Sequence, residues 1–291
     1  MRRVIIVVIA IASCGLTLAA APDFRVQRED TSHATLHFGG SGTRTLDLRT
    51  IEGAIHVTAD PARDAVVTIQ RTVRAEDDAA AVAGLADVRA ELTDNAATIG
   101  VTVRDRNQVV CGESSNRRDN AWWDRPRYRV RVDLTARVPA NTRVRLCAIN
   151  GGEIEMTGVI GDFDVTNVNG PIALSGLRGS GRATTVNGAV TASFTAAPQS
   201  ESLFKTINGS VTTTFPSDLS ADLRLKTFHG GLFTDFDVHA VAATPLVDRS
   251  QGDGRVVYRS NAYTVVRAGS GGPQLTLETL NGDVRVLRAS R

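Results

Sequence analysis

A short phrase recurs seven times between Leu46 and Val286, and it restricts the fold more than any other feature of the chain. Each copy centres on a turn pair whose second residue is glycine. Successive copies at Asn150, Asn169, Asn187 and Asn208 are 19, 18 and 21 residues apart. Such a period is typical of stacked structural units that share one core. The seven pairs are Glu52-Gly53, Asn150-Gly151, Asn169-Gly170, Asn187-Gly188, Asn208-Gly209, His229-Gly230 and Asn281-Gly282. The repetition predicts a scaffold.

The apolar positions around each turn favour a coiled chain over flat hairpins. Asn-Gly is a strong signal for a two-residue hairpin, in which side chains alternate and an apolar residue is expected two places after Asn. The sequence places the apolar residue three places after the turn instead, as at Ile172, Val190 and Val211. Apolar residues also stand four places and one place before each turn. These two positions are three residues apart, so the alternation of a straight strand would put them on opposite faces. We therefore expect the chain to bend between them and keep both inside. The residues one place before are Ile51, Ile149, Val168, Val186, Ile207, Phe228 and Leu280.

We therefore predict an all-β fold, a β-solenoid or β-helix-like stack of strand repeats, with one short helix in the N-terminal half. Neighbouring strands would stack at about 4.8 Å. The turn residues Asn150, Asn169, Asn187, Asn208 and Asn281 would then form an amide ladder along one edge. Asn can also stand there only because left-handed corners favour Asn and Gly. The two interpretations are compatible. In the copy at Asn150, the apolar residue after the turn is shifted by one position, to Ile154, because an extra glycine, Gly152, follows the turn.

The N-terminus has the layout of a secretory signal peptide. Arg2 and Arg3 precede an uncharged stretch from Val4 to Ala12, and small residues follow. This order of positive, apolar and small residues predicts cleavage after residue 20, and the stretch is too short for a convincing membrane span. An alternative is a lipoprotein acylated at Cys14, but the residues after it are still apolar. We expect an exported protein of the periplasm, outer envelope or extracellular space.

Charge and cysteine content fit that location. Removing the leader leaves 33 − 2 = 31 basic and 31 acidic residues, so bulk charge gives no reason to expect a nucleic-acid partner. Two cysteines remain, Cys111 and Cys147. In an oxidising compartment an even count favours a disulfide; the alternative is two buried thiols.

The chain divides into two parts that we expect to be continuous. Residues 24–138 form a less regular β-rich part, with a helix from Glu76 to about Ala86 that packs over one end of the stack. This part includes a polar insertion at 107–127. Residues 139–291 form the strand-repeat solenoid. Its pattern fades after Asp235 and returns in Leu275–Val286, a last copy that we expect to close the array.

The polar insertion is the candidate binding site. Flat indole faces beside planar arginine donors suit a sugar ring, an acidic glycan or a protein hot spot. The alternative is that the indoles only cover the flank of the stack. The residues concerned are Trp122, Trp123, Arg125, Arg127 and Tyr128.

Evidence for catalysis is weak. Asp162 with Asp164, and Glu153 with Glu155, are carboxylate pairs of the kind that glycosidases need, but a solvated outer face accounts for them better. The five histidines have poor metal-ligand spacing, and no nucleophile elbow, phosphate loop or dinucleotide fingerprint is present. We expect no catalytic residue, metal or cofactor.

The leader, the strand-helix-strand lead-in, the segment Val138-Pro139-Ala140-Asn141-Thr142 and the serial Thr-Val-Asn-Gly or Thr-Ile-Asn-Gly phrases together resemble a known family. This is the bacterial putative-adhesin family of β-strand repeats, also called the toastrack domain. The resemblance implies an extended β-solenoid at the cell envelope, acting in adhesion or envelope-stress signalling, without known catalytic residues. Glu52 and His229 depart from Asn at the turn.

From these observations we expect a non-catalytic, exported adhesin-like or envelope scaffold protein whose partner is an envelope protein or glycan. One alternative is a periplasmic sensory or regulatory module in envelope stress. A second alternative is a carbohydrate-active β-helix enzyme.

Overall fold

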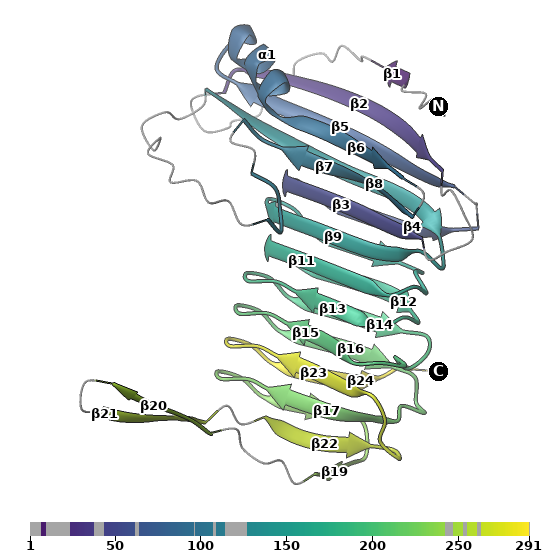
Figure 1. Cartoon of the computed structure of the whole chain (residues 1–291), viewed down its shortest axis with the longest axis vertical. Helices are drawn as coiled ribbons and strands as arrows, with labels where there is room; N and C mark the ends of the chain where they lie inside the picture. Colours follow the sequence, from purple (N-terminus) through teal and green to yellow (C-terminus); the bar gives the residue numbers. More distant parts are fainter. Residues whose placement is uncertain are drawn as a thin grey trace.

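The computed structural model describes residues 7–9, 24–37, 44–61, 64–95, 97–106, 109–113, 127–241, 247–252, 255–260 and 263–290. This part of the chain is mostly β, with one helix and two large mixed sheets (Figure 1). Sheet I has the strand order β1-β2-β5-β8-β4-β10-β12-β14-β16-β24-β18. Sheet II has the order β19-β22-β17-β23-β15-β13-β11-β9-β3-β7-β6, and β20 pairs with β21 separately.

The N-terminal part mixes antiparallel and parallel pairing. Strand β5 lies between β2 and β8, antiparallel to both, and β8 then runs parallel to β4. The predicted helix is present but begins at Asp78, after the expected start at Glu76, because the Asp77 side chain caps it by accepting a hydrogen bond from the Ala80 amide at 2.8 Å. The elements are β1 Val7–Ile9, β2 Val26–Leu36, β3 Thr45–Glu52, β4 Ile55–Asp60, β5 Ala65–Ala75, α1 Asp78–Asp87, β6 Arg89–Asp94, β7 Thr98–Arg104 and β8 Tyr128–Pro139.

Helix α1 packs against β2, β5 and β8 at the N-terminal end of the stack (Figure 1). Its buried residues are small: Ala80, Ala81 and Gly84. A Cβ on Gly84 would lie 2.9 Å from the ring of Tyr128. Small side chains on this helix face therefore let it approach β8 closely.

Every repeat turn joins a strand of sheet II to a strand of sheet I. We call one such unit, a strand of sheet II, its turn and the following strand of sheet I, a rung. The strands on either side of a turn do not pair with each other; each pairs in parallel with strands of neighbouring rungs, as β11 does with β9 and β13. The turns are therefore corners and not hairpin tips. Further rung strands are β9 Arg143–Asn150, β10 Ile154–Thr157, β11 Phe163–Asn169, β12 Ile172–Leu177, β13 Gly181–Thr184, β14 Val190–Phe194, β15 Ser202–Lys205, β16 Val211–Phe215, β17 Ala221–Lys226 and β18 Leu232–Thr234.

The last copy in the sequence does not close the array, contrary to our prediction. Strand β23 pairs with β15 on one side and β17 on the other, and β24 lies between β16 and β18. The rung of Asn281 is thus inserted between those of Asn208 and His229. The remaining strands are β19 Val238–Ala240, β20 Val247–Gly252, β21 Arg255–Ser260, β22 Thr264–Ala268, β23 Gln274–Glu278 and β24 Val284–Arg288.

The core lies between the two sheets. The residues four places before each turn are buried there, and Phe204 among them is fully buried. Its ring meets that of Phe194 edge to face, with 6.0 Å between centroids, and Phe194 stacks on Phe215 at 4.9 Å. Apolar side chains from both sheets therefore fill one continuous interior.

The residues one place before the turn point outward, and our prediction that they lie inside is wrong. Ordinary strand alternation runs unbroken up to the turn, so the residue two places before it faces the core instead. This is usually a threonine whose buried hydroxyl donates to a glycine carbonyl of a neighbouring rung: Thr206 to Gly188 at 2.7 Å and Thr279 to Gly209 at 2.7 Å. A hydroxyl satisfied in this way can be buried without a large penalty.

Candidate interaction surface

The turn residues form a continuous ladder of hydrogen-bonded side chains. The Asn169 amide nitrogen donates to the Asn150 amide oxygen at 2.6 Å, and the corresponding bonds from Asn187 to Asn169 and from Asn208 to Asn187 are each 2.7 Å. Asn281 donates to Asn208 at 2.7 Å. Each amide thus donates in the same direction along the stack.

His229 extends the ladder at its far end. Its Nδ1 lies 2.9 Å from the Asn281 amide oxygen. Because an amide oxygen can only accept, this contact requires the proton on Nδ1. The departure from Asn at His229 therefore preserves the ladder.

A column of apolar side chains runs beside the ladder on the outer face of sheet II. It consists of the residues one place before each turn. Three of them are exposed: Ile207 at 37%, Leu280 at 45% and Phe228 at 69%. These three belong to consecutive rungs, because Asn208 pairs with Asn281 and Asn281 with His229. The other members, Ile51, Ile149, Val168 and Val186, are partly buried.

We call the amide ladder and this apolar column together the turn-edge surface. The neighbouring outward row on sheet II is charged: Lys205 and Lys226 approach Glu278 at 3.3 and 4.0 Å. The Tyr263 hydroxyl donates to Glu278 at 2.8 Å. Burial and this carboxylate raise the pKa of Tyr263 to about 12. The apolar column is therefore bordered by amides on one side and by compensated charges on the other.

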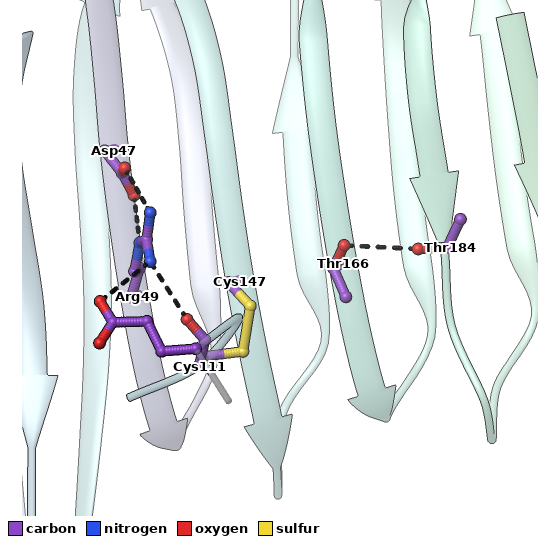
Figure 2. The surroundings of a disulfide bond; sticks show 7 residues. Asp47, Arg49, Cys111, Cys147, Thr166 and Thr184 are labelled. Carbon is purple, nitrogen blue, oxygen red and sulfur yellow. Dashed lines mark hydrogen bonds and ion pairs between the residues drawn. A yellow bond between two sulfur atoms is a disulfide. The ribbon is translucent and has the colours of Figure 1, made fainter. Parts of the chain in front are cut away.

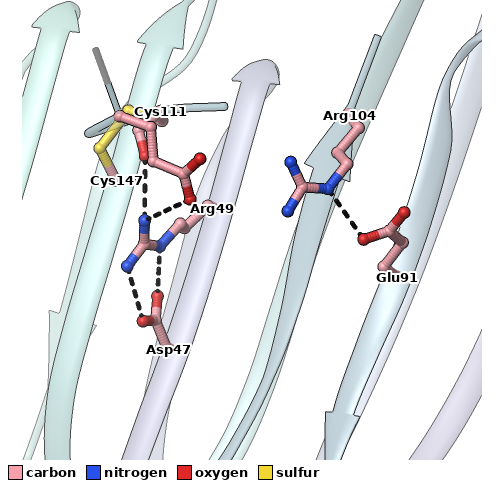
Figure 3. Close-up of polar contacts among 7 residues, drawn as sticks. Asp47, Arg49, Glu91, Arg104, Cys111 and Cys147 are labelled. Atoms are coloured by element: carbon pink, nitrogen blue, oxygen red, sulfur yellow. Dashed lines mark hydrogen bonds and ion pairs between the residues drawn. A yellow bond between two sulfur atoms is a disulfide. The ribbon is translucent and has the colours of Figure 1, made fainter. Parts of the chain in front are cut away.

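Cys111 and Cys147 form a disulfide across the outer face of sheet II (Figure 2). The bond joins the segment after β7 to β9, which lies between β3 and β11 in sheet II. Arg49 lies beside it and donates to the Cys111 carbonyl at 3.4 Å and to Asp47 at 2.8 Å (Figure 3). The hydrogen bond to Asp47 raises the pKa of Arg49. The same face carries an ion pair between Arg104 and Glu91 at 2.8 Å.

The structure describes only part of the polar insertion at 107–127. Trp122, Trp123 and Arg125 lie outside the described residues. The Arg127 guanidinium contacts Glu76 at 2.5 Å and Asp77 at 2.7 Å. These two carboxylates raise the pKa of Arg127.

Tyr128 contacts α1 itself, whereas Arg127 contacts the two residues just before it. Its hydroxyl donates to Asp87, and burial together with that carboxylate raises the pKa of Tyr128 to about 12. Both Arg127 and Tyr128 therefore hold the helix in place, and the prediction that they bind a ligand stays a prediction.

The two carboxylate pairs lie on the outer surface, with Asp164 and Glu155 in strands and Asp162 and Glu153 just before them. Asp162 accepts a hydrogen bond from the Ser180 amide at 3.2 Å, and Asp164 is exposed. Glu153 and Glu155 flank buried Ile154 and are both exposed. Within the described part, no helix has the length and apolar character that crossing a bilayer requires.

Comparison with known proteins gives a likeness at the level of solved structures. No family model matches the chain, and no curated protein matches it. The structure of a putative cell adhesion protein from Clostridium sporogenes ATCC 15579 is 8% identical and covers 90% of this chain and 100% of its own, with a TM-score of 0.35. A putative adhesin from Bacteroides fragilis NCTC 9343 is 9% identical and covers 91% and 96%, with a TM-score of 0.36.

A putative adhesin from Parabacteroides merdae ATCC 43184 is 10% identical over 89% and 96% of the two chains, with a TM-score of 0.19. The chain resembles bacterial putative adhesins. At these identities and TM-scores, the likeness does not extend to what the chain binds.

Proposed function

We propose that this protein is a non-catalytic, exported β-solenoid that serves as an adhesin-like scaffold and binds a protein of the cell envelope through its turn-edge surface. The observation that carries the proposal is the run of exposed Ile207, Leu280 and Phe228 on consecutive rungs. A contiguous patch of exposed apolar side chains with polar groups at its rim is typical of an interaction site.

The chemistry of the turn-edge surface favours a protein partner over a glycan. An aliphatic and aromatic column gains most from burial against other apolar side chains. The exposed amides beside it supply hydrogen-bond groups at the rim, where solvent can still reach them. Repetition at the strand spacing suits an extended segment that contacts several rungs at once.

Rigidity supports the scaffold role. The rungs are joined by parallel pairing, by the amide ladder and by buried threonine hydroxyls. The disulfide adds a covalent link on the outer face, as expected of a protein outside the reducing cytosol. Such a body presents a binding face in a fixed shape, so little ordering entropy is lost on association.

The test replaces the exposed column and measures binding to isolated envelopes of the producing organism. The triple variant Ile207→Ser, Phe228→Ser, Leu280→Ser is expected to lose binding while its melting temperature stays close to that of the wild type. The matched control is Val82→Ser with Ile160→Ser, because these side chains are also exposed, at 56% and 42%, and lie elsewhere. Equal binding by the triple variant would refute the proposed surface. Release of reducing ends from envelope polysaccharide by the pure protein would refute the non-catalytic role.

A further inference from the structure

Three side chains of metal-binding types converge on the outer face of sheet I, away from the turn-edge surface. They are His56 of β4, Glu153 in the turn before β10, and Glu155 of β10. One donor atom from each lies within 4.8 Å of the others. His56 Nδ1 lies 3.1 Å from Glu155 Oε2.

The rung register fixes this convergence. Strands β4 and β10 pair in parallel with Ile55 opposite Ile154, and His56 opposite Glu155. Both isoleucines are fully buried, so their neighbours His56 and Glu155 must point away from the core. The Ile55 amide also donates to the Glu153 carbonyl at 3.0 Å, which holds the turn against β4.

The glycine inserted into this copy makes room for the second carboxylate. A Cβ on Gly152 would lie 2.2 Å from the Gly53 carbonyl oxygen, so a larger residue does not fit there. This extra glycine lets the chain pass close to the rung of Gly53. The next residue, Glu153, then points outward, and Ile154 after it points into the core. In this copy alone among the seven, glutamates stand on both sides of the inward residue that follows the turn.

The surroundings leave the two glutamates open to a cation. On the side of the next rung, Ala173 is in register with Glu155, and the Pro171 carbonyl accepts from the Ile154 amide. Neither Glu153 nor Glu155 forms an ion pair with lysine or arginine among the residues that the structure describes. Other outward carboxylates do, including Asp133 with Arg131, Asp222 with Arg267 and Asp283 with Arg285.

We propose that His56, Glu153 and Glu155 form a binding site for a divalent transition metal, with Zn²⁺ the best match. One imidazole nitrogen and two carboxylate oxygens are ligands that Zn²⁺ accepts. Mg²⁺ and Ca²⁺ prefer oxygen alone. The two carboxylates offset the charge of the ion, and three protein ligands leave a position for water. The His56 side chain is 35% exposed and that of Glu155 is 49% exposed, so the ion reaches them without opening the core.

The experiment titrates the untagged protein by isothermal calorimetry with ZnCl₂, MgCl₂ and CaCl₂ separately. One Zn²⁺ per chain is expected, with no comparable heat from Mg²⁺ or Ca²⁺. Loss of a ligand in His56→Ala, Glu153→Gln or Glu155→Gln should weaken binding by at least about tenfold, because even outer partners of ligands contribute about that much.

His37→Ala is the matched control. His37 Nδ1 lies 3.0 Å from a single carboxylate, that of Asp64, in an exposed pair, so its loss should leave Zn²⁺ binding unchanged. A second readout is the melting temperature, which Zn²⁺ should raise in the wild type and in His37→Ala but not in His56→Ala. Absence of one-to-one Zn²⁺ binding, or unchanged binding in His56→Ala, would overturn the proposal. Because the turn-edge surface uses none of these residues, failure here is distinct from failure of the proposed function.

Discussion

Removing the disulfide tests how the outer face of sheet II is held together. The variant Cys111→Ser, Cys147→Ser keeps both positions small and polar while it opens the covalent loop. We expect the native fold to survive, because β9 stays paired with both β3 and β11. The main change should therefore occur in the unfolded chain, which gains the freedom that the bond removes.

The size of the effect follows from the length of the closed loop. The two cysteines are 36 residues apart in sequence. For this length the chain-entropy relation gives about 13 cal/mol/K, which is about 4 kcal/mol at 25 °C. The substitution should weaken the native state little, since the neighbouring hydrogen bond from Arg49 to the Cys111 carbonyl is long, at 3.4 Å. We thus expect the free energy of unfolding to fall by about 3 to 4 kcal/mol.

The assay is urea unfolding followed by circular dichroism under non-reducing conditions. Thiol titration of the unfolded wild type, prepared without the predicted leader, should first show no free thiol. Thr166→Ser is the matched control, because Thr166 is in register with Cys147 on the same strand pair and makes no cross-link; its effect should stay within about 0.5 kcal/mol. A loss below about 1 kcal/mol in the double variant would refute the argument from loop entropy.

Three further outcomes are expected. Phe204→Ala should lower the free energy of unfolding by about 3 to 5 kcal/mol, because Phe204 is fully buried. The control Phe233→Ala, at a residue 51% exposed, should lower it by less than about 1 kcal/mol. Urea unfolding measures both changes. Asn187→Ala removes two ladder hydrogen bonds, to Asn169 and from Asn208, and should cost about 1 kcal/mol in the same assay, with no change contradicting a stabilising ladder. The pKa of Tyr128 is raised to about 12 in the folded protein, so its protonated hydroxyl stabilises the fold below about pH 10, and this stabilisation is lost as pH rises toward 12. The urea midpoint of Tyr128→Phe should therefore fall less between pH 8 and 12 than that of the wild type. Identical pH profiles of the two proteins would contradict this.

The repeated phrase was sufficient to predict where the chain turns, but not which side chains face the core. Sequence reasoning placed every apolar residue inside and therefore invoked a bend before the turn. The structure buries Thr206 and exposes Ile207 instead. The signal that could have shown this was the threonine of the Thr-Ile-Asn-Gly phrase, whose hydroxyl can be buried when a backbone carbonyl of the next rung accepts its proton.

The stacking order lay beyond reach for a different reason. Successive copies carry nearly the same residues, so no local feature says which rung will lie beside which. The copy at Asn281 fits against that at Asn208 as well as the copy at His229 would, since an amide or an imidazole can donate to the Asn208 oxygen. Only the complete set of strand pairs decides the order.

The candidate sites show the same division between local and distant information. The ladder residues follow directly from the turn pairs. The group of His56, Glu153 and Glu155 combines residues from different copies, so no spacing within one copy predicts it. Arg127 and Tyr128 looked available for a ligand because their partners, Glu76 before α1 and Asp87 at its end, are about 40 to 50 positions away in the chain.

The inserted rung has a consequence for biosynthesis. Among the strands that the structure describes, β18 pairs only with β24, and β17 pairs with β22 and β23 and not with β15. A nascent chain that has emerged as far as β18 lacks every strand that will hold β17 and β18 in place. Native pairing beyond β16 must therefore wait until β23 and β24 have been synthesised, and a truncation before β23 removes an interior rung and not an end.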